Sequence, residues 1–331
     1  MSPPRLLAAT LVAGAIAGLG GACSSSSNDP PPAGEADASA DAADASLGKR
    51  VAPELYDCRA PGPPARTSRI APSCATDPSC KERLVSAHRG AGGDLGVIAP
   101  ENTVSATRAA IALGVDFVET DPRPSKDGAI VNVHDTDVSR VTEGSGNVAD
   151  MTLAELRALK LKTSKFPGDF GCERIATLEE ILTTARGRVH VLVDANKTDA
   201  VDKLVDAIVK TDTLDWAIFD TSAVDKIDRA IAIEPRIKTM IRVETEAELT
   251  TTLAHFAAHP PVLVEIHGNG TPEVLVGPIH GAKNRPLFDV FGVDVAVRFV
   301  PDLSQYGKVY DKGVDVVQTD RPDLVLALLG R

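Results

Sequence analysis

The sequence predicts an α/β fold, a (β/α)8 TIM barrel, and three observations support this prediction. From about residue 84 the chain alternates short β-rich runs with helical stretches, which is typical of βα units with parallel strands. Hydrophobic residues make up 43% of the 331-residue chain and aromatic residues only 4%, so aliphatic side chains must fill the core, as in strands buried on both faces. The stretch from 84 to 331 also has about the 250 residues that such a barrel needs.

Nine runs qualify as strands where the barrel needs eight. They are LVSAH (84–88), VDFVET (115–120), AIVNVHD (129–135), VHVLVDA (189–195), WAIFDT (216–221), IKTMIRV (237–243), PVLVEIHG (261–268), LFDVFGVD (287–294) and VDVVQTD (314–320). We expect the surplus run to lie among residues 261–295. Between VDFVETD (115–121) and the third run lies only PRPSKDG (122–128), which is too short for a crossover helix and predicts an extended return with its turn at 126–128.

Residues 1–22 are typical of an export signal, with one Arg, an apolar run and then small residues before Cys23. The end of this segment resembles a bacterial lipoprotein signal, in which Cys23 receives the lipid that anchors the protein to a membrane; an ordinary secretory signal is the alternative. Residues 23–50 are rich in Ser, Pro, Ala and Asp and lack apolar anchors, so we expect a disordered tether. The expected location is the cell envelope, as an exported lipoprotein.

An N-terminal arm, residues 51–83, separates the tether from the barrel of residues 84–331 and holds Cys58, Cys74 and Cys80. With Cys172 they number four, which permits two disulfides in an oxidising compartment, and three pairings are open. Cys74 and Cys80 could close a small local loop, and Cys58 with Cys172 would then tie the arm to the barrel. A zinc site is the weaker alternative, because the spacings fit no zinc pattern.

The charge balance limits the classes of partner. A net charge of −11 argues against binding to nucleic acid or to anionic lipid surfaces. A small anionic substrate would therefore need a local cationic group or a bound metal ion. Polar residues that follow the predicted strands supply candidates for both, because the carboxyl ends of barrel strands surround the active site.

Glu119 and Asp121 are the strongest candidates for metal ligands. They lie two residues apart on one predicted strand and so share a face. Two carboxylates on one face favour a single divalent cation with oxygen ligands, Ca²⁺ or Mg²⁺ rather than Zn²⁺. The alternative is a pair of solvated acids at the rim.

His88 and His134 each end a predicted strand, and two imidazoles with a pKa of about 6.5 can share acid and base roles near neutral pH. A structural role for either His alone is the alternative. Arg89 offers a planar cation for a phosphate. Asp135 is expected to support the loop rather than His134, because successive strand residues point to opposite faces. Asn102 stands at a helix start as an N-cap. These groups suit hydrolysis of a phosphodiester.

Seven motifs resemble the glycerophosphodiester phosphodiesterase family. They are HRG (88–90), PENT (100–103), FVETD (117–121), SKDGAIVNVHD (125–135), SRVTEGSGNVADMTLAEL (139–156), TLEEIL (177–182) and GVDVVQTDRPDLV (313–325). The resemblance spans residues from about 84 to 330. It implies a (β/α)8 barrel and a phosphoric diester hydrolase that cleaves a small-molecule glycerophosphodiester, with a divalent metal, to sn-glycerol 3-phosphate and an alcohol.

Carried onto this chain, the resemblance implies roles for individual residues. His88 and His134 correspond to the acid/base pair, Arg89 to a phosphate ligand, and Glu119 and Asp121 to metal ligands. Residues 139–175 correspond to a small insertion after the third strand, which we expect to cap the mouth of the barrel.

Two departures from the family pattern concern the metal and the substrate. The third metal ligand usually belongs to a Glu-x-Lys; here Asp194 takes the place of the Glu, and Lys197, a substrate ligand by the resemblance, lies three residues on instead of two. Asp is shorter by about 1.5 Å, against a Ca–O distance of about 2.3–2.6 Å, so the loop or a water would have to close the gap. The late strand carries Phe288 and Phe291 where the family often has Trp-Thr, and the only Trp is Trp216.

Two other functions remain open. One is a phospholipase D-like or C-like diesterase that acts on lysophospholipids or inositol phosphodiesters. The other is a catalytically degenerate barrel that serves as a surface-binding lipoprotein. The replacement at Asp194 and the shifted Lys197 favour the degenerate barrel, whereas the intact histidines and the Glu119–Asp121 pair oppose it.

Overall fold

The computed structural model describes residues 47–331. The expected signal peptide (1–22), the expected lipid attachment at Cys23 and the tether up to residue 46 lie outside the described residues. Within 47–331, no helix combines the length and the apolar character that a bilayer-spanning segment needs.

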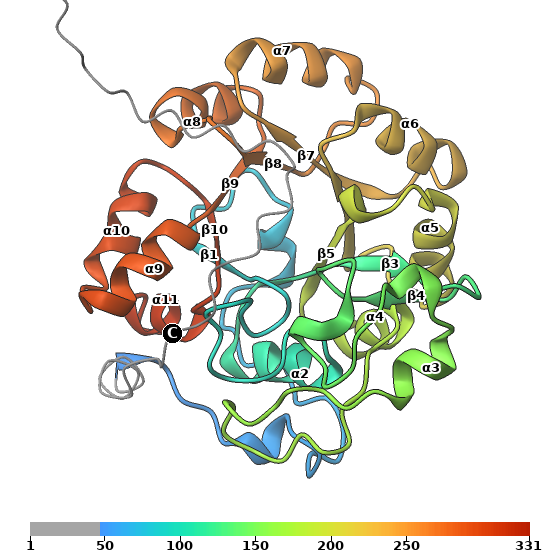
Figure 1. Ribbon diagram of the computed structural model, residues 1–331. Helices are drawn as coiled ribbons and strands as arrows, with labels where there is room; N and C mark the ends of the chain where they lie inside the picture. Colours follow the sequence, from blue (N-terminus) through green and yellow to red (C-terminus); the bar gives the residue numbers. More distant parts are fainter. Residues whose placement is uncertain (1–46) are drawn as a thin grey trace, which may run out of the picture. The chain divides into compact units, whose positions relative to one another are not determined.

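Eight parallel strands close into a barrel in the order β1-β10-β9-β8-β7-β6-β5-β2, which confirms the predicted fold class (Figure 1). The strands are β1 (Leu84–Ala87), β2 (Phe117–Thr120), β5 (His190–Asp194), β6 (Ala217–Thr221), β7 (Lys238–Val243), β8 (Leu263–Ile266), β9 (Arg285–Asp289) and β10 (Val316–Thr319). Most of their residues are buried, because the interior of the barrel packs against one face and the helices cover the other.

Helices surround the barrel as a ring (Figure 1). They are α2 (Val104–Leu113), α4 (Leu178–Ala185), α5 (Val201–Lys210), α6 (Val224–Ile233), α7 (Glu246–His255), α8 (Pro272–Gly281), α9 (Phe291–Phe299), α10 (Ser304–Asp311) and α11 (Pro322–Leu328). Helix α5 shows why such segments are helical: Val201, Leu204, Val205 and Ile208 recur at spacings of three and four and are all buried.

The surplus strand is not where the sequence analysis expected it. Both late runs supply barrel strands, β8 and β9, and the second half of LFDVFGVD begins helix α9. The run AIVNVHD instead forms β4 (Ile130–Asn132), which pairs antiparallel with β3 (Pro122–Pro124) outside the barrel. The short link permits this arrangement because an antiparallel hairpin needs only a turn, whereas a parallel pair needs a crossover.

The insertion follows the third predicted strand along the chain, as expected, although that strand lies outside the barrel. It contains η3 (Val138–Arg140), η4 (Val148–Asp150) and α3 (Leu153–Ala158), and α3 begins at a capping box of Thr152 and Glu155. Its buried aliphatic side chains form a separate small core with those of the β4 region. A disulfide from Cys172 to Cys58 ties the end of the insertion to the arm, which lies beside it at the lower edge of Figure 1.

The arm also closes the amino-terminal end of the barrel. Its second disulfide, Cys74–Cys80, packs against the innermost side chains of the strands, among them Phe117 and Leu192. Arg285, fully buried, donates to the main-chain oxygens of Cys74 and Glu82. The two disulfides correspond to one of the three pairings left open by the sequence. Because this end of the barrel is closed, the carboxyl end carries the site.

Candidate active site

Three buried carboxylates meet at the carboxyl end of β2 and β5. Each of Glu119, Asp121 and Asp194 offers an oxygen within 4.8 Å of the others. Thr120 pairs with Val193 in the parallel ladder, so the residues that follow them end the two strands side by side. The shorter side chain of Asp194 therefore does not remove it from the cluster, because its strand already places it there.

Electrostatics make this cluster a suitable cation site. Burial, repulsion from Asp121 and repulsion from Asp194 raise the pKa of Glu119 well above its usual value. All three side chains are almost inaccessible to solvent. Hard carboxylate oxygens buried together are the donor set that Ca²⁺ or Mg²⁺ prefers. The residues therefore fit a divalent cation.

His88 lies at the edge of this cluster, with Nε2 3.8 Å from a Glu119 oxygen. Its Nδ1 is 2.7 Å from an oxygen of Asp320, at the end of β10. Burial alone would lower the pKa of His88, but the hydrogen bond to Asp320 and the charge of Glu119 raise it to about 10. Gly93 permits this pairing, because a Cβ there would lie 2.9 Å from the His88 ring and 2.6 Å from Asp320.

Asp320, to which no role was assigned from the sequence, is the partner of His88. Besides His88, its carboxylate accepts from the main-chain nitrogens of Gly93 and Leu95. These three contacts fix both the imidazole and the loop that follows it. The signal in the sequence was the last motif, QTDRPD, which places Asp320 directly after a strand.

His134 is linked to the cluster through Lys197. Lys197, in the turn after β5, brings Nζ 3.3 Å from His134 Nε2 and 4.0 Å from an oxygen of Asp121. The expectation for Asp135 is wrong: its carboxylate lies 2.8 Å from His134 Nδ1 and is a direct partner. Strand alternation does not apply there because β4 ends at Asn132. The hydrogen bond from His134, followed by that from Arg140, holds the pKa of Asp135 well below its usual value.

Arg89 is buried beside the acids. Its main-chain nitrogen donates to Glu119, and its Nε is 3.6 Å from an Asp121 oxygen. Its Nη1 contacts Asp94 at 3.0 Å and Glu101 at 3.2 Å. The structure thus brings all seven candidate residues of the sequence analysis into one region, and Glu101 of the PENT motif joins them through Arg89.

Asn102 does not cap the following helix; Thr103 does, by accepting from the nitrogen of Ala106. The Asn102 side chain instead donates to an oxygen of Asp121 at 2.8 Å and accepts from the main-chain nitrogen of the same residue. Its φ of 57° is unusual for a residue other than glycine. This conformation turns the amide into the site, so Asn102 orients a candidate metal ligand.

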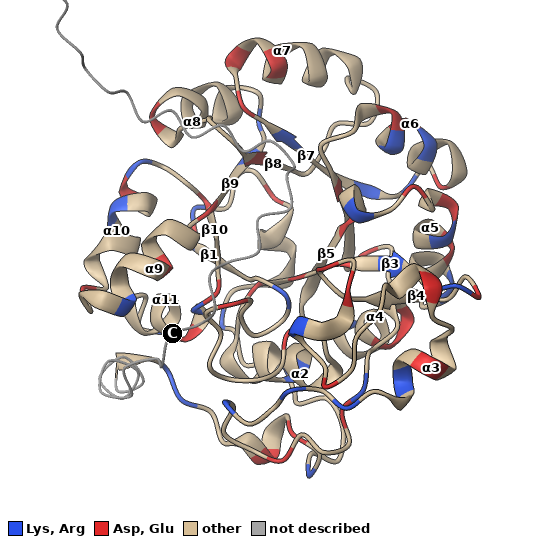
Figure 2. Ribbon diagram, viewed as in Figure 1, with Lys and Arg blue, Asp and Glu red and all other residues tan. Residues whose placement is uncertain are grey.

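A second group of buried charges adjoins the first. Arg242 on β7 contacts Asp220 on β6 at 2.5 Å and Glu265 on β8 at 3.1 Å. It also reaches Asp194, at 3.4 Å, and so links the two groups. Figure 2 shows charged segments of both signs on the strands inside the helical ring. Neither Asp220 and Glu265 nor the arginine that pairs with them were among the candidate residues predicted from the sequence.

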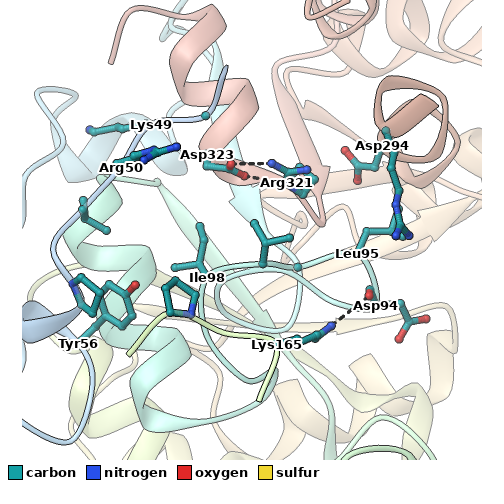
Figure 3. Close-up of a pocket in the computed structure, with 17 residues that line it drawn as sticks. Lys49, Arg50, Tyr56, Asp94, Leu95, Ile98, Lys165, Asp294, Arg321 and Asp323 are labelled. Carbon is teal, nitrogen blue, oxygen red and sulfur yellow. Dashed lines mark hydrogen bonds and ion pairs between the residues drawn. The ribbon is translucent and has the colours of Figure 1, made fainter. Parts of the chain in front are cut away.

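A cavity of about 570 Å³ lies beside the site (Figure 3). The arm, the β1–α2 loop and the end of β10 line it, and Lys165 of the insertion donates to the main-chain oxygen of Asp94. None of the candidate acids or histidines lines it, so the cavity lies behind the β1–α2 loop. Trp216 is also outside the site, because it packs on His190 at the start of β5. Phe291 is exposed at the start of α9, and Phe288 is half-buried at the end of β9.

Comparison with known proteins gives one consistent result. The sequence model of the "Glycerophosphoryl diester phosphodiesterase family" matches residues 88–324. A glycerophosphodiester phosphodiesterase of Caldanaerobacter subterraneus subsp. tengcongensis is 44% identical over 98 residues, 30% of this chain and 38% of that protein. Another, of Bacillus subtilis, is 25% identical over 261 residues, 73% of this chain and 84% of that protein. The chain thus spans about two fifths of the first relative.

Solved structures show the same barrel. A glycerophosphoryl diester phosphodiesterase of Parabacteroides distasonis superposes with a TM-score of 0.67 at 22% identity, over 78% of this chain and 90% of that chain. A phosphodiesterase of Oleispira antarctica, in complex with the product sn-glycerol-3-phosphate, gives 0.60 at 24% identity, over 76% and 99%. At these identities the likeness supports the fold.

Proposed function

The chain belongs to the glycerophosphoryl diester phosphodiesterase family, and on that premise we propose that it hydrolyses glycerophosphodiesters to sn-glycerol 3-phosphate and an alcohol. The single observation that supports this activity most strongly is the arrangement of His88 and His134. Each has its own carboxylate partner. His88 lies 3.8 Å from Glu119, and Lys197 contacts both His134 and Asp121.

Glu119, Asp121 and Asp194 would hold the divalent cation, Ca²⁺ or Mg²⁺. When bound, it would supply positive charge against the phosphate oxygens and the charge that develops on them. Arg89 and Lys197 are placed to bind the same anion, because both cations lie beside Asp121. With that cation bound, the strongly negative chain would have a local site that attracts a phosphodiester.

The two histidines suit different proton transfers. A lysine ammonium can only donate, so the contact from Lys197 makes His134 Nε2 an acceptor and fits His134 as the general base that takes a proton from the attacking water. The raised pKa of His88, about 10, fits it as the general acid that protonates the leaving alcohol. A cation held by Glu119 would bring that pKa closer to neutral, since the charge of Glu119 is part of what raises it.

Hydrolysis of glycerophosphocholine by the purified chain tests the proposal. We expect turnover with added Ca²⁺ or Mg²⁺, none with a chelator, and sn-glycerol 3-phosphate as the product in phosphorus NMR. His134→Ala should abolish turnover, whereas His255→Ala, on the outer helix α7, should not. Wild-type turnover in the His134→Ala protein would contradict the acid/base assignment.

A panel of diesters distinguishes the alternatives. Preferred cleavage of a lysophospholipid or an inositol phosphodiester would favour the phospholipase D-like or C-like diesterase. Binding of glycerophosphocholine without turnover at any metal concentration would favour the degenerate, surface-binding barrel. Ca²⁺ and Mg²⁺ titrations, followed by thermal melting, identify the preferred cation.

We also propose that the protein is exported and lipidated at Cys23. Two disulfides within residues 47–331 support an oxidising compartment. Expression of a Cys23→Ser variant tests the anchor: we expect the wild type in the membrane fraction and the variant in the soluble exported fraction. Equal distribution of the two proteins would contradict lipidation.

A further inference from the structure

We propose that Arg140, in the insertion, is a positioning residue that holds His134 and Arg89 in place through three carboxylates. The inference rests on the proposed function, because it concerns the same phosphodiester site. Arg140 touches neither histidine and none of the candidate metal ligands, so its action passes through Asp135, Glu101 and Asp94.

The contacts of Arg140 use both sides of its guanidinium group. Nε is 2.5 Å from an oxygen of Asp135, whose other oxygen holds His134 Nδ1 at 2.8 Å. Nη1 and Nη2 each lie 2.7 Å from an oxygen of Glu101, a two-pronged contact, and Nη1 also reaches Asp94 at 2.8 Å. The Arg140 side chain thus joins the partner of the proposed base to both partners of the proposed phosphate ligand. The first partner is Asp135, which holds His134. The other two are Glu101 and Asp94, which contact Arg89.

The contact with Asp135 fixes the imidazole of His134. With one oxygen on Arg140 and the other on His134, the carboxylate cannot rotate without losing a charge-assisted hydrogen bond. Nδ1 then keeps its hydrogen bond to Asp135, and Nε2 stays directed toward Lys197. Loss of Arg140 would free this carboxylate, and a small misplacement of a reacting group costs up to about 100-fold in rate.

The contacts with Glu101 and Asp94 leave Arg89 available to a ligand. Arg89 reaches the same two carboxylates, at longer distances than Arg140 does. Without Arg140, Arg89 and Lys165 would have to balance both negative charges, and the substrate phosphate would have to compete with these carboxylates for Arg89. Arg140 therefore supports substrate binding as well as turnover.

The insertion holds Arg140 where these contacts form. Val138, in the same 3-10 turn, is fully buried in the separate core of the insertion. Asp137 caps the turn by accepting from the nitrogen of Ser139, and the Cys58–Cys172 disulfide anchors the far end of the insertion. The segment expected to cap the mouth thus also supplies a fixed support for the catalytic groups.

Kinetics of the full chain with Arg140→Gln and Arg140→Lys test the inference. We expect Arg140→Gln to lower kcat by about 10- to 100-fold and to raise KM, with the melting temperature within about 3 °C of the wild type. Arg140→Lys keeps the charge but not the two-pronged contact, so it should stay at least about fivefold below the wild type in kcat/KM. If the Arg140→Gln protein melts more than about 3 °C below the wild type, the kinetics of Arg140→Lys alone decide the inference.

Arg157→Gln is the matched control. Arg157 lies on the same insertion, is about as exposed as Arg140 and forms one ion pair, with Glu180, away from the site. Its kinetics should stay within about twofold of the wild type. Wild-type kinetics in Arg140→Gln, or full activity in Arg140→Lys, would overturn the inference.

A double variant and a spectroscopic measurement separate positioning from a general loss of structure. Asp135→Asn breaks the same link between Arg140 and His134. The fold-loss in kcat of the double variant should therefore be well below the product of the two single fold-losses. A fold-loss equal to that product would contradict the link. In ¹⁵N-histidine spectra, Arg140→Gln should shift the His134 Nδ1 signal and Arg157→Gln should not. If the wild type itself has no turnover, the proposed function fails, and this spectrum alone decides the inference: an unchanged signal overturns it.

Discussion

Two groups of buried acids share the mouth of the barrel, and they differ in how their charge is balanced. In the first, oxygens of Glu119, Asp121 and Asp194 lie within 4.8 Å of one another, and each basic side chain beside them, at 3.4–4.0 Å, pairs with only one of the three. In the second, Asp220 and Glu265 flank the guanidinium of Arg242. A buried charge is costly unless it is paired, so the second group supplies its own cation and the first lacks one at its centre.

This difference indicates which of the two groups of acids has a catalytic function and which is structural. Both groups end barrel strands, and both are inaccessible to solvent. The pKa of Asp220 rises to about 7 because burial outweighs the opposing charge of Arg242, whereas nothing comparable opposes the rise at Glu119 apart from His88 and one main-chain nitrogen. A guanidinium between the acids therefore marks the second group as structural, and its absence between the acids of the first group favours that group as the site of a bound cation.

The largest expected effect comes from Asp121→Asn, which removes one negative charge from the first group. Turnover should fall by about 10³-fold or more, because a ligand and a negative charge are lost together. The metal-free variant should melt higher than the metal-free wild type, because one repulsive charge has gone, and added Ca²⁺ should no longer raise its melting temperature. Retained stabilisation by Ca²⁺ would contradict the assignment of Asp121 as a ligand.

Arg242→Met makes the second group resemble the first by removing its cation. We expect a loss of about 3–5 kcal/mol in the free energy of unfolding at pH 8, since acids are left buried without a partner. The pKa of Asp220 is already raised in the folded state, so the native protein binds more protons than the unfolded one, and stability should recover as the pH falls below 7. Denaturant unfolding at pH 8 and pH 5.5 measures both effects; equal losses at the two values would contradict them.

The pH dependence of Ca²⁺ affinity is the next smaller effect and sharpens the comparison without a mutation. Because the pKa of Glu119 is raised well above its usual value, the cation must displace a proton at low pH. The Kd for Ca²⁺, from calorimetric titration, should therefore fall as the pH rises from 6 to 8, by at most about tenfold per unit for one proton. A Kd that is independent of pH would show that Glu119 is already ionised in the metal-free protein.

The sequence predicted the barrel and the positions of the site residues well, because both follow from local order along the chain. Strands that end in His88, Asp121 or Asp194 must place these residues at one rim once the barrel closes. The surplus strand was misplaced because β4 looks like any buried strand, and only the pairing with β3 takes it out of the barrel.

The support of the site could not be predicted, because it depends on contacts between distant segments. Asp135 was assigned to the wrong face because the end of β4 cannot be read from residue types. Arg140 and Arg242 carry no motif that distinguishes a bridging arginine from a surface one; their partners come from other loops and strands. The sequence therefore predicts which groups react more easily than what orients them.

The smallest effect concerns Asp194, the residue that joins the two groups. Its Oδ1 accepts from the main chain and side chain of Asn196, both at 2.7 Å, and its Oδ2 lies 3.4 Å from Arg242. The carboxylate is therefore already held within 4.8 Å of Glu119 and Asp121 by contacts that a longer side chain would displace. Asp194→Glu should weaken Ca²⁺ binding by a few-fold, since an added methylene in a packed site costs about 1 kcal/mol or more. Tighter binding in this variant would show instead that the shorter side chain limits the affinity, and Asp199→Glu, at an exposed position beyond the same turn, provides the control.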